Sequence, residues 1–340
     1  MQINIVEETN LNNWENYLKE FSSTFFLSSP FLEALRDKRL IPLYLRFECE
    51  GKNVGLLSGL SILPIKSFLR KIYSPLFFYS GPLVIGNDKE LINRCMSELF
   101  EYAVQKKYSH LMVESRDYTY DINFENKLFN KLKREAYIID LKDEWESIKK
   151  KMRPFVPRQV RKAERHELTF HESNSDQIVD EVIKLMKKTK SVRLSKGYID
   201  YNYFYIPYLN KMTLKKMVNN KAVRGFYVQL KDKIISAQLI AAYNKRAYAL
   251  FVGTDDEAYK LGASNFIYFN IIKQLKAEDY EYFNIGGIAK DSSYSNMFFA
   301  KTSLGAEKHW CWYGYTKNLH GFIPNQSTIF YNKLRKLIKR

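Results

Sequence analysis

Apolar and polar positions alternate in a hairpin-like pattern at two places far apart in the chain. Residues 43–63 contain an apolar run, a polar turn at 50–53 and a second run of small and apolar residues. Residues 224–243 repeat this order around a polar turn at 231–233. Two such runs on either side of a short polar turn predict an antiparallel hairpin.

Each predicted hairpin is followed by a helical pattern and then by a short strand. Residues 89–106 and 263–275 carry apolar side chains at the three- and four-residue spacing of an amphipathic helix. Short apolar runs at 110–113 and 280–285 come next. The repeated order of strand, turn, strand, helix and strand indicates an internal duplication of one mixed α/β unit.

We expect the boundary between the two copies within residues 141–165, which gives domains at 1–148 and 149–340. Pro154 and Pro157 should interrupt a helix there, since proline lacks an amide donor and restricts the residue before it. Beyond them, basic residues at spacings of three and four should share one helix face. They are Arg158, Arg161, Lys162 and Arg165.

Composition supports a folded protein of two domains. Of 340 residues, 46% are hydrophobic and 27% are charged, as in ordinary globular proteins. The net charge is +17, which favours a polyanionic partner such as nucleic acid, an anionic membrane surface or a phosphate-bearing substrate. A lysine-rich composition without any such partner is the alternative.

Three features favour a cytoplasmic location. No run of eighteen uncharged apolar residues is present, so a membrane-spanning helix is not expected. Residues 1–10 carry two glutamates and no basic residue, unlike a secretory signal. Cys49, Cys95 and Cys311 are odd in number and far apart, which is typical of buried thiols in a reducing compartment rather than of disulfides or a zinc site.

Four segments carry a resemblance to a known family. In chain order they are 26–35, 158–170, 251–264, and 283–287 together with 299–305. They resemble segments of the FemABX aminoacyl transferases and their relatives among the GNAT-fold acyltransferases. The last pair looks like that family's glycine pair and its Phe-Lys-x-x-Phe-Gly signature, with Ala300 and Leu304 in place of the two phenylalanines.

The resemblance implies a mixed α/β fold of two tandem GNAT-like domains, each a mixed sheet flanked by helices. It also implies that Lys301 is a catalytic cation at the carbonyl or leaving-group oxygen of an ester. From the residues alone, a lysine after the apolar run 297–300 could simply extend to solvent. Its register with Gly305 favours the catalytic interpretation.

Further substrate-binding residues are expected on the same basis. Gly286 and Gly287 would allow close ligand approach, or would form an ordinary turn. Tyr243 and Tyr248 would line the cleft of the second domain, or would pack in its sheet. Arg36 and Lys38 would bind a phosphate of the substrate, or would be solvated residues at a helix end.

Two basic clusters could bind a polyanion. Arg158, Arg161, Lys162 and Arg165 are expected to contact RNA phosphates without sequence preference. A second cluster near the C-terminus could contact RNA or the inner membrane surface, which makes peripheral membrane association possible, or could be a solvated tail. Its members are Lys333, Arg335, Lys336, Lys339 and Arg340.

The predicted reaction joins an amino acid from charged tRNA to an amine on an anionic peptidoglycan precursor. It needs no metal, cofactor or covalent nucleophile, and no DNA partner is expected. His166 and His171 match no zinc-ligand pattern. One alternative is an acyl-CoA-dependent N-acyltransferase in polysaccharide or lipid modification, although residues 260–263 retain only a reduced version of a phosphate-binding loop. Another is a non-catalytic RNA- or membrane-binding protein on the same fold.

Overall fold

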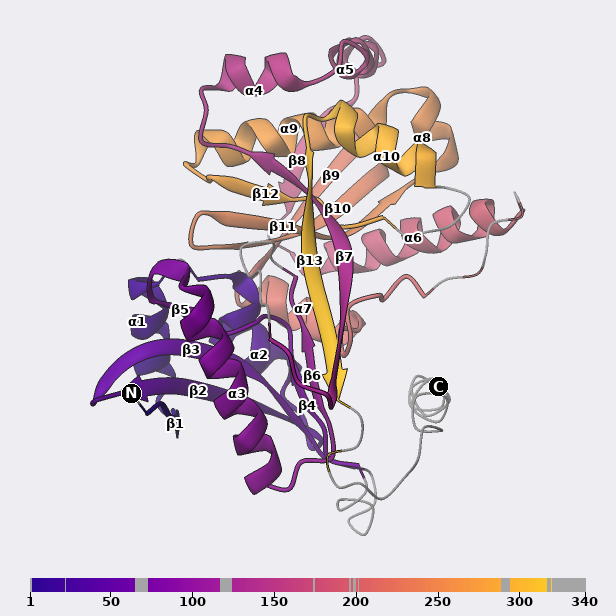
Figure 1. Cartoon of the computed structure of the whole chain (residues 1–340). Coiled ribbons are helices and arrows are strands. Elements are labelled where there is room, and N and C mark those ends of the chain that lie inside the picture. The colour runs from indigo at the N-terminus through magenta and orange to yellow at the C-terminus, as the bar shows by residue number, and fades with distance from the viewer. Residues whose placement is uncertain are drawn as a thin grey trace. The chain divides into compact units, whose positions relative to one another are not determined.

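The computed structural model divides into two compact units, each assembled from separate stretches of chain (Figure 1). Unit 1 comprises Met1–Ser22, Arg36–Arg134 and Cys311–Arg340, and unit 2 comprises Ser23–Leu35 and Glu135–Trp310. The residues described are 2–21, 23–64, 73–116, 124–173, 175–195, 197, 200, 202–288, 294–316 and 319.

Within its described residues, unit 1 is a mixed sheet with two α-helices. Its strands are hydrogen-bonded in the order β1, β2, β3, β4, β6, β13, and β5 pairs with β3. The β4–β6 pair is parallel, and the others are antiparallel. The elements are β1 (Asn4–Glu7), α1 (Leu11–Glu20), β2 (Leu40–Cys49), β3 (Lys52–Ile62), β4 (Leu76–Phe78), β5 (Leu83–Val84), η3 (Ile85–Asn87), α3 (Lys89–Gln105), β6 (Leu111–Glu114) and part of β13 (Glu307–Thr316).

The first predicted hairpin is β2–β3. Glu50 and Gly51 form its turn with φ values of 51° and 76°, a left-handed conformation that glycine adopts without strain. Gly59 lies where β4 approaches closely, since a Cβ there would be 2.3 Å from the Phe77 carbonyl oxygen. The three cysteines are buried thiols, as expected.

Unit 2 is a sheet covered by helices on both faces. Its strands follow the order β7, β12, β11, β10, β9, β8, and only the β11–β12 pair among these is parallel. The elements are η1 (Phe25–Leu27), α2 (Ser29–Leu35), part of β7 (Phe129–Asp140), α4 (Trp145–Lys151), α5 (Phe155–Arg165), β8 (Thr169–Ser173), α6 (Gln177–Ser195), α7 (Lys211–Asn219), β9 (Val223–Leu230), β10 (Lys233–Tyr243), β11 (Arg246–Thr254), α8 (Asp256–Lys260), α9 (Ala263–Ala277), β12 (Tyr282–Asn284) and α10 (Tyr294–Ser303).

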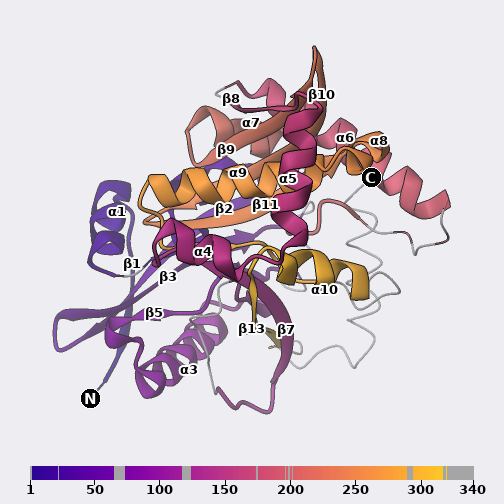
Figure 2. The same cartoon turned by 90° about the horizontal axis from the view of Figure 1, so that it is seen from above.

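Helices α9 and α6 pack on unit 2's sheet, and α5 lies across α9 (Figure 2). Glycine permits the close approach of α6, because a Cβ on Gly225 or Gly253 would lie 2.5 or 2.6 Å from side-chain atoms of Ile178 and Leu185. The predicted apolar face of α9 is buried in the core. Its partners include the buried apolar residues of α5, which are Val156, Val160 and Ala163.

Strand β12 is much shorter than its parallel neighbour β11. The two pair only from Arg246–Tyr282 to Tyr248–Asn284, and β11 then continues to Thr254. Beyond the paired part, the Leu250 carbonyl accepts a hydrogen bond of 2.5 Å from the Tyr205 hydroxyl. The chain after β12 therefore leaves β11 but stays hydrogen-bonded to β7, where Ile285 and Gly286 pair with the Tyr137 backbone.

Two sequence expectations differ in detail from the fold. Pro157 does not interrupt a helix but lies in the first turn of α5, where backbone amides have no helical acceptor and proline is tolerated. The division expected at residues 148 and 149 falls inside unit 2, which also takes 23–35 from the N-terminal part.

Among the described residues, no helix is long and apolar enough to cross a membrane.

Candidate active site

Lys301 lies in the last turn of α10 and points into unit 2. Its side chain is buried, whereas residues 295–300 of the same helix are exposed. The Lys301 ammonium donates hydrogen bonds to the carbonyl oxygens of Ile285 and Gly286, the latter at 3.3 Å. Both carbonyls belong to the segment directly after β12.

The glycine pair shapes this segment. Gly286 has φ +78°, and its amide donates to the Asn284 Oδ1 atom at 2.8 Å, which holds the turn. A Cβ on Gly287 would lie 2.4 Å from the Glu135 carbonyl oxygen of β7. Gly286 therefore provides a left-handed turn, and Gly287 allows two backbones to approach.

Lys301 is a buried cation without a carboxylate partner in the described part of the chain. Burial lowers its pKa to about 7, since a charged group is less stable away from water. Its ammonium also lies 5.8 Å from the centre of the Tyr137 ring. A lysine in this setting changes charge near neutral pH.

A second polar group lies beside Lys301 and was not predicted from the sequence. The Tyr294 and Tyr137 hydroxyls donate to Glu135 Oε2 at 2.9 and 3.1 Å, and Lys308 approaches the same carboxylate at 3.8 Å. The Glu135 side chain is only 8% exposed. Burial, with the hydrogen bonds to Tyr294 and Glu135, raises the pKa of Tyr137. The sequence feature that could have indicated this group is the two-residue spacing of Glu135 and Tyr137, which places both on one face of a strand.

The other predicted site residues have different surroundings. Tyr248 is 2% exposed, with its ring 5.2 Å from that of Phe26 and 5.7 Å from that of Tyr282, so it is a packing element of the sheet. Tyr243 is half-buried at the end of β10. Arg36 and Lys38 are exposed and belong to unit 1, apart from the unit that holds Lys301, and their role stays a prediction.

The predicted basic helix is α5. Arg158, Arg161 and Arg165 are exposed and Lys162 is half-buried. Arg158 donates to the Pro154 carbonyl at 3.2 Å, and among the described residues none of the four has an ion-pair partner. Arg161 and Arg165 line an open surface hollow with Glu164. The C-terminal basic cluster lies outside the described residues.

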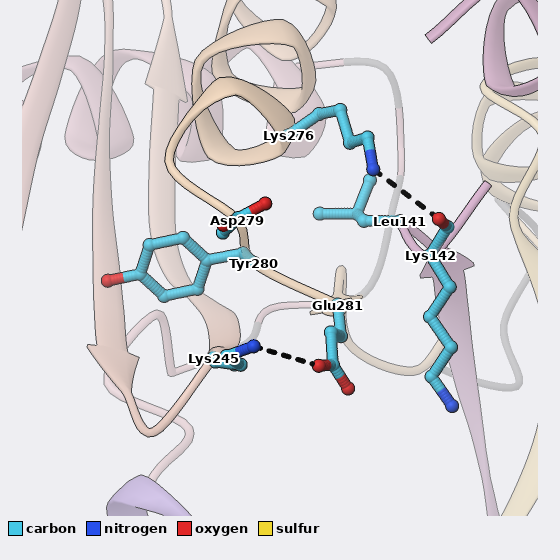
Figure 3. A pocket seen from close by; sticks show the side chains of 7 residues that line it. All are labelled: Leu141, Lys142, Lys245, Lys276, Asp279, Tyr280 and Glu281. Atoms are coloured by element: carbon cyan, nitrogen blue, oxygen red, sulfur yellow. Dashed lines mark hydrogen bonds and ion pairs between the residues drawn. The ribbon is translucent and has the colours of Figure 1, made fainter. Parts of the chain in front are cut away.

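A small lysine-lined pocket of about 270 Å³ opens at the other end of the β11–β12 pair (Figure 3). Lys245 pairs with Glu281, and Lys276 donates to the Lys142 carbonyl. This pocket lies where β11 and β12 begin, whereas Lys301 lies where β12 ends. Ligands of parallel sheets bind at the carboxyl ends of strands, so the geometry favours the Lys301 end. The remaining lining residues are Leu141, Asp279 and Tyr280.

Comparison with known proteins bears out the fold and enzyme class. Residues 150–294 match a family model described as an acetyltransferase (GNAT) domain. A sequence search finds no match among curated proteins.

Three solved structures show similarity over nearly the whole chain. A crystal structure of FemX has TM-score 0.69 and 12% identity, covering 98% of this chain and 100% of that one. L-PGS from Bacillus licheniformis has TM-score 0.57 and 16% identity, covering 98% of both. A tandem GNAT protein from the clavulanic acid biosynthesis pathway has TM-score 0.50 and 9% identity, covering 94% and 99%.

The predicted mixed α/β fold with GNAT-like halves, and the predicted resemblance to FemABX proteins at the level of fold, are confirmed. Residues 150–294 match an acetyltransferase (GNAT) domain, and the chain has the fold of FemX, which bears out the predicted enzyme class, acyltransferase.

Proposed function

We propose that this protein is an aminoacyl transferase that moves an amino acid from charged tRNA to an amine on an anionic peptidoglycan precursor. The observation that carries the proposal is the setting of Lys301. It is a buried ammonium group held by two backbone carbonyls, with no carboxylate to neutralise it among the described residues.

The chemistry of ester aminolysis accounts for this setting. The acceptor amine attacks the ester carbonyl, a C–N bond forms, and the carbonyl oxygen gains negative charge before the C–O bond to the ribose breaks. Two N–H groups of the Lys301 ammonium are engaged by Ile285 and Gly286, which leaves a third for that oxygen or for the departing ribose oxygen. A fixed positive charge in a water-poor site stabilises such an oxyanion.

The amine must also lose a proton, and the ribose oxygen must gain one. Glu135 is a nearby carboxylate that accepts hydrogen bonds from Tyr137 and Tyr294. We do not assign it as the base, because its two tyrosine partners already occupy it. In this proposal the proton passes from the attacking amine to the departing ribose oxygen, so no protein base is needed.

The negative charge of the proposed tRNA donor supports the same function. The exposed arginines of α5 have no carboxylate partners among the described residues, so they are available to tRNA phosphates. Arg36 and Lys38 of unit 1 stay predicted phosphate-binding residues. No metal or organic cofactor enters the reaction.

Acyl-CoA is the second candidate donor, because the matched domain is described as an acetyltransferase. In this chain the reduced loop before α9 packs against α5. Gly262 has φ +81°, and a Cβ there would lie 2.5 Å from the Gln159 carbonyl oxygen. A helix N-terminus approached by another backbone has less room for a pyrophosphate, which favours charged tRNA over acyl-CoA.

The test is a transfer assay with the full chain. Purified protein is incubated with tRNA charged with a mixture of radiolabelled amino acids and a nucleotide-linked peptidoglycan precursor that carries a lysine side chain. We expect label in the precursor, and loss of that label with Lys301→Met. Turnover with acetyl-CoA and an amino sugar, without transfer from any charged tRNA, would replace the proposal with the acyl-CoA alternative. Activity in neither assay would favour a non-catalytic binding protein.

A further inference from the structure

Helix α10 presents an apolar surface to solvent. Its residues 295–300 are all exposed, and Met297, Phe298 and Phe299 are 38%, 38% and 43% exposed. Consecutive helical residues lie about 100° apart, so these three side chains span roughly 200° of the helix circumference. Single exposed apolar residues are common, whereas three in succession on one helix are more than scattered exposure, and large exposed apolar surfaces are typical of interaction sites.

Basic residues continue directly from this apolar surface. The Arg153 guanidinium lies 5.1 Å from the centre of the Phe299 ring, and the Phe155 ring lies 5.8 Å from it. The Arg153 amide donates to the Ser303 carbonyl at 2.9 Å, which joins α10 to the start of α5. Figure 2 shows α10 beside that end of α5. The exposed arginines Arg158, Arg161 and Arg165 follow along α5.

We propose that the apolar side of α10 and the arginines of α5 form a docking surface for an anionic lipid bilayer. Apolar side chains of a surface helix enter the boundary between headgroups and acyl chains, and neighbouring arginines bind anionic headgroups. The four arginines named here have no carboxylate partner within ion-pair distance among the described residues, so the surface keeps a net positive charge although Glu164 lies between Arg161 and Arg165.

A bilayer fits this surface better than nucleic acid does. Stacking of bases needs open aromatic faces. The Phe298 ring is stacked on Tyr294 at 15° and 6.2 Å, and a face of Phe299 holds Arg153. Met297, the third member, has no ring. What these residues offer is apolar volume and ring edges, which a bilayer accepts from any direction.

The inference does not depend on the proposed reaction. If both hold, tRNA phosphates and lipid headgroups compete for the arginines of α5, and docking brings Lys301, on the inward side of α10, to the membrane surface. An acceptor attached to a lipid would then be within reach of the site.

The test is flotation of the full chain with vesicles. One set contains phosphatidylcholine alone, and the other contains about one third phosphatidylglycerol. We expect binding to the anionic vesicles that weakens at high salt, as for any interaction of exposed charges. The triple variant Met297→Ser, Phe298→Ser, Phe299→Ser should bind at least tenfold more weakly. Arg158→Glu with Arg161→Glu should also bind at least tenfold more weakly.

A matched control changes three exposed apolar residues outside this surface. The native side chains of Ile85, Leu194 and Met212 are 58%, 42% and 64% exposed. The triple variant Ile85→Ser, Leu194→Ser, Met212→Ser should bind as the wild type does. Equal loss in the control, or no binding to anionic vesicles by the wild type, would overturn the proposal. Retained vesicle binding with lost tRNA binding in the α10 variant would assign the surface to RNA instead.

A second measurement keeps the native apolar side chains. The described cysteines are all buried, so Asn296→Cys on exposed α10 can be labelled selectively with a polarity-sensitive dye. Anionic vesicles should shift its emission to the blue, as expected on entry into a less polar medium. An unchanged spectrum at saturating vesicle concentration would contradict insertion of α10 even if the serine variant failed to fold.

Discussion

Unit 2 contains two cations with opposite surroundings: Lys301 is 8% exposed, and the Arg224 side chain is 18% exposed. Arg224 of β9 donates to Glu172 at 2.7 and 2.8 Å and to Glu278 at 2.8 Å. Although burial acts to lower it, these hydrogen bonds raise the pKa of Arg224 above its ordinary value. Lys301 has only carbonyl partners, and burial lowers its pKa to about 7.

The difference separates a structural charge from a reactive one. Two carboxylates satisfy Arg224, so it joins β9 to β8 and to the end of α9 and has little left to offer a ligand. The Lys301 ammonium is a buried positive charge that no carboxylate neutralises among the described residues. Such a charge lowers stability, and buried charges of this kind are typical of functional sites. Arg224 is more exposed than Lys301, and the larger difference between them lies in their partners.

The largest expected effect is loss of activity in Lys301→Met. We expect transfer to fall by about 10²–10³-fold, the usual range for removing one oxyanion-stabilising group. The midpoint of thermal unfolding should stay equal or rise, since a buried unpaired charge is removed. Lys276→Met, in the pocket at the opposite end of β11 and β12, serves as the control and should keep its activity. A lysine important only for packing would instead show lower stability with little change in rate.

Arg224→Met should give the reverse result. It leaves Glu172 and Glu278 with the neutral Gln274 amide as their shared partner, and we expect the free energy of unfolding to fall by about 2 kcal/mol. This is below the range for fully buried pairs, because the two carboxylates are 28% and 36% exposed. Urea unfolding measures the loss, and the rate per folded molecule should not change. If activity falls while stability holds, the contrast between the two cations is mistaken.

The pH dependence should belong to Lys301 alone. Above its pKa of about 7, the ratio of wild-type rate to Lys301→Met rate should fall by up to tenfold per pH unit, because the ammonium is lost. Using the ratio removes the titration of the acceptor amine, which both proteins share. A ratio that is constant between pH 6 and pH 9 would exclude a charged Lys301 from the reaction.

Unfolding provides an independent measure of the same pKa. Between about pH 7 and the ordinary lysine pKa of 10.5, the unfolded chain binds a proton at Lys301 that the folded chain does not. Stability from this group therefore rises with pH across that window. The rise should be absent in Lys301→Met and present in Arg224→Met. A wild type and a Lys301→Met variant with parallel stability curves would show that the lysine is less buried than its contacts indicate.

The smallest effect is expected at Gly286, the first residue of the glycine pair. Gly286→Ala should cost about 1 kcal/mol through strain at φ +78°, with open space for its methyl group except for the Lys301 ammonium at 4.0 Å. Gly287→Ala should cost more, since its methyl group would meet the Glu135 backbone. Chemical denaturation measures the loss of stability in each variant. Equal losses in the two variants would argue against the described path of the chain after β12.

Much of the fold could be predicted because it depends on local pattern. The two hairpins, α3 and α9 each carry their own periodicity and turn residues, and Lys301 was identified by its register with Gly305. Glu135 could not be found in this way, since its partner Tyr294 lies 159 residues away. The lowered pKa of Lys301 also depends on burial by distant strands. Pro157 was misjudged because its effect depends on which helical turn it occupies.

The assignment of residues 23–35 to unit 2 has a consequence for biosynthesis. Every stretch of unit 2 precedes Cys311, so unit 2 is complete once Trp310 has emerged from the ribosome, whereas unit 1 still lacks Cys311–Thr316 of β13. Because domains fold as their sequence emerges, unit 2 is able to fold first although most of its sequence comes later. A gene cut at codon 148 would give one fragment without β13 and another without Phe25 and Phe31. Isolated halves of this chain are therefore poor starting points for expression.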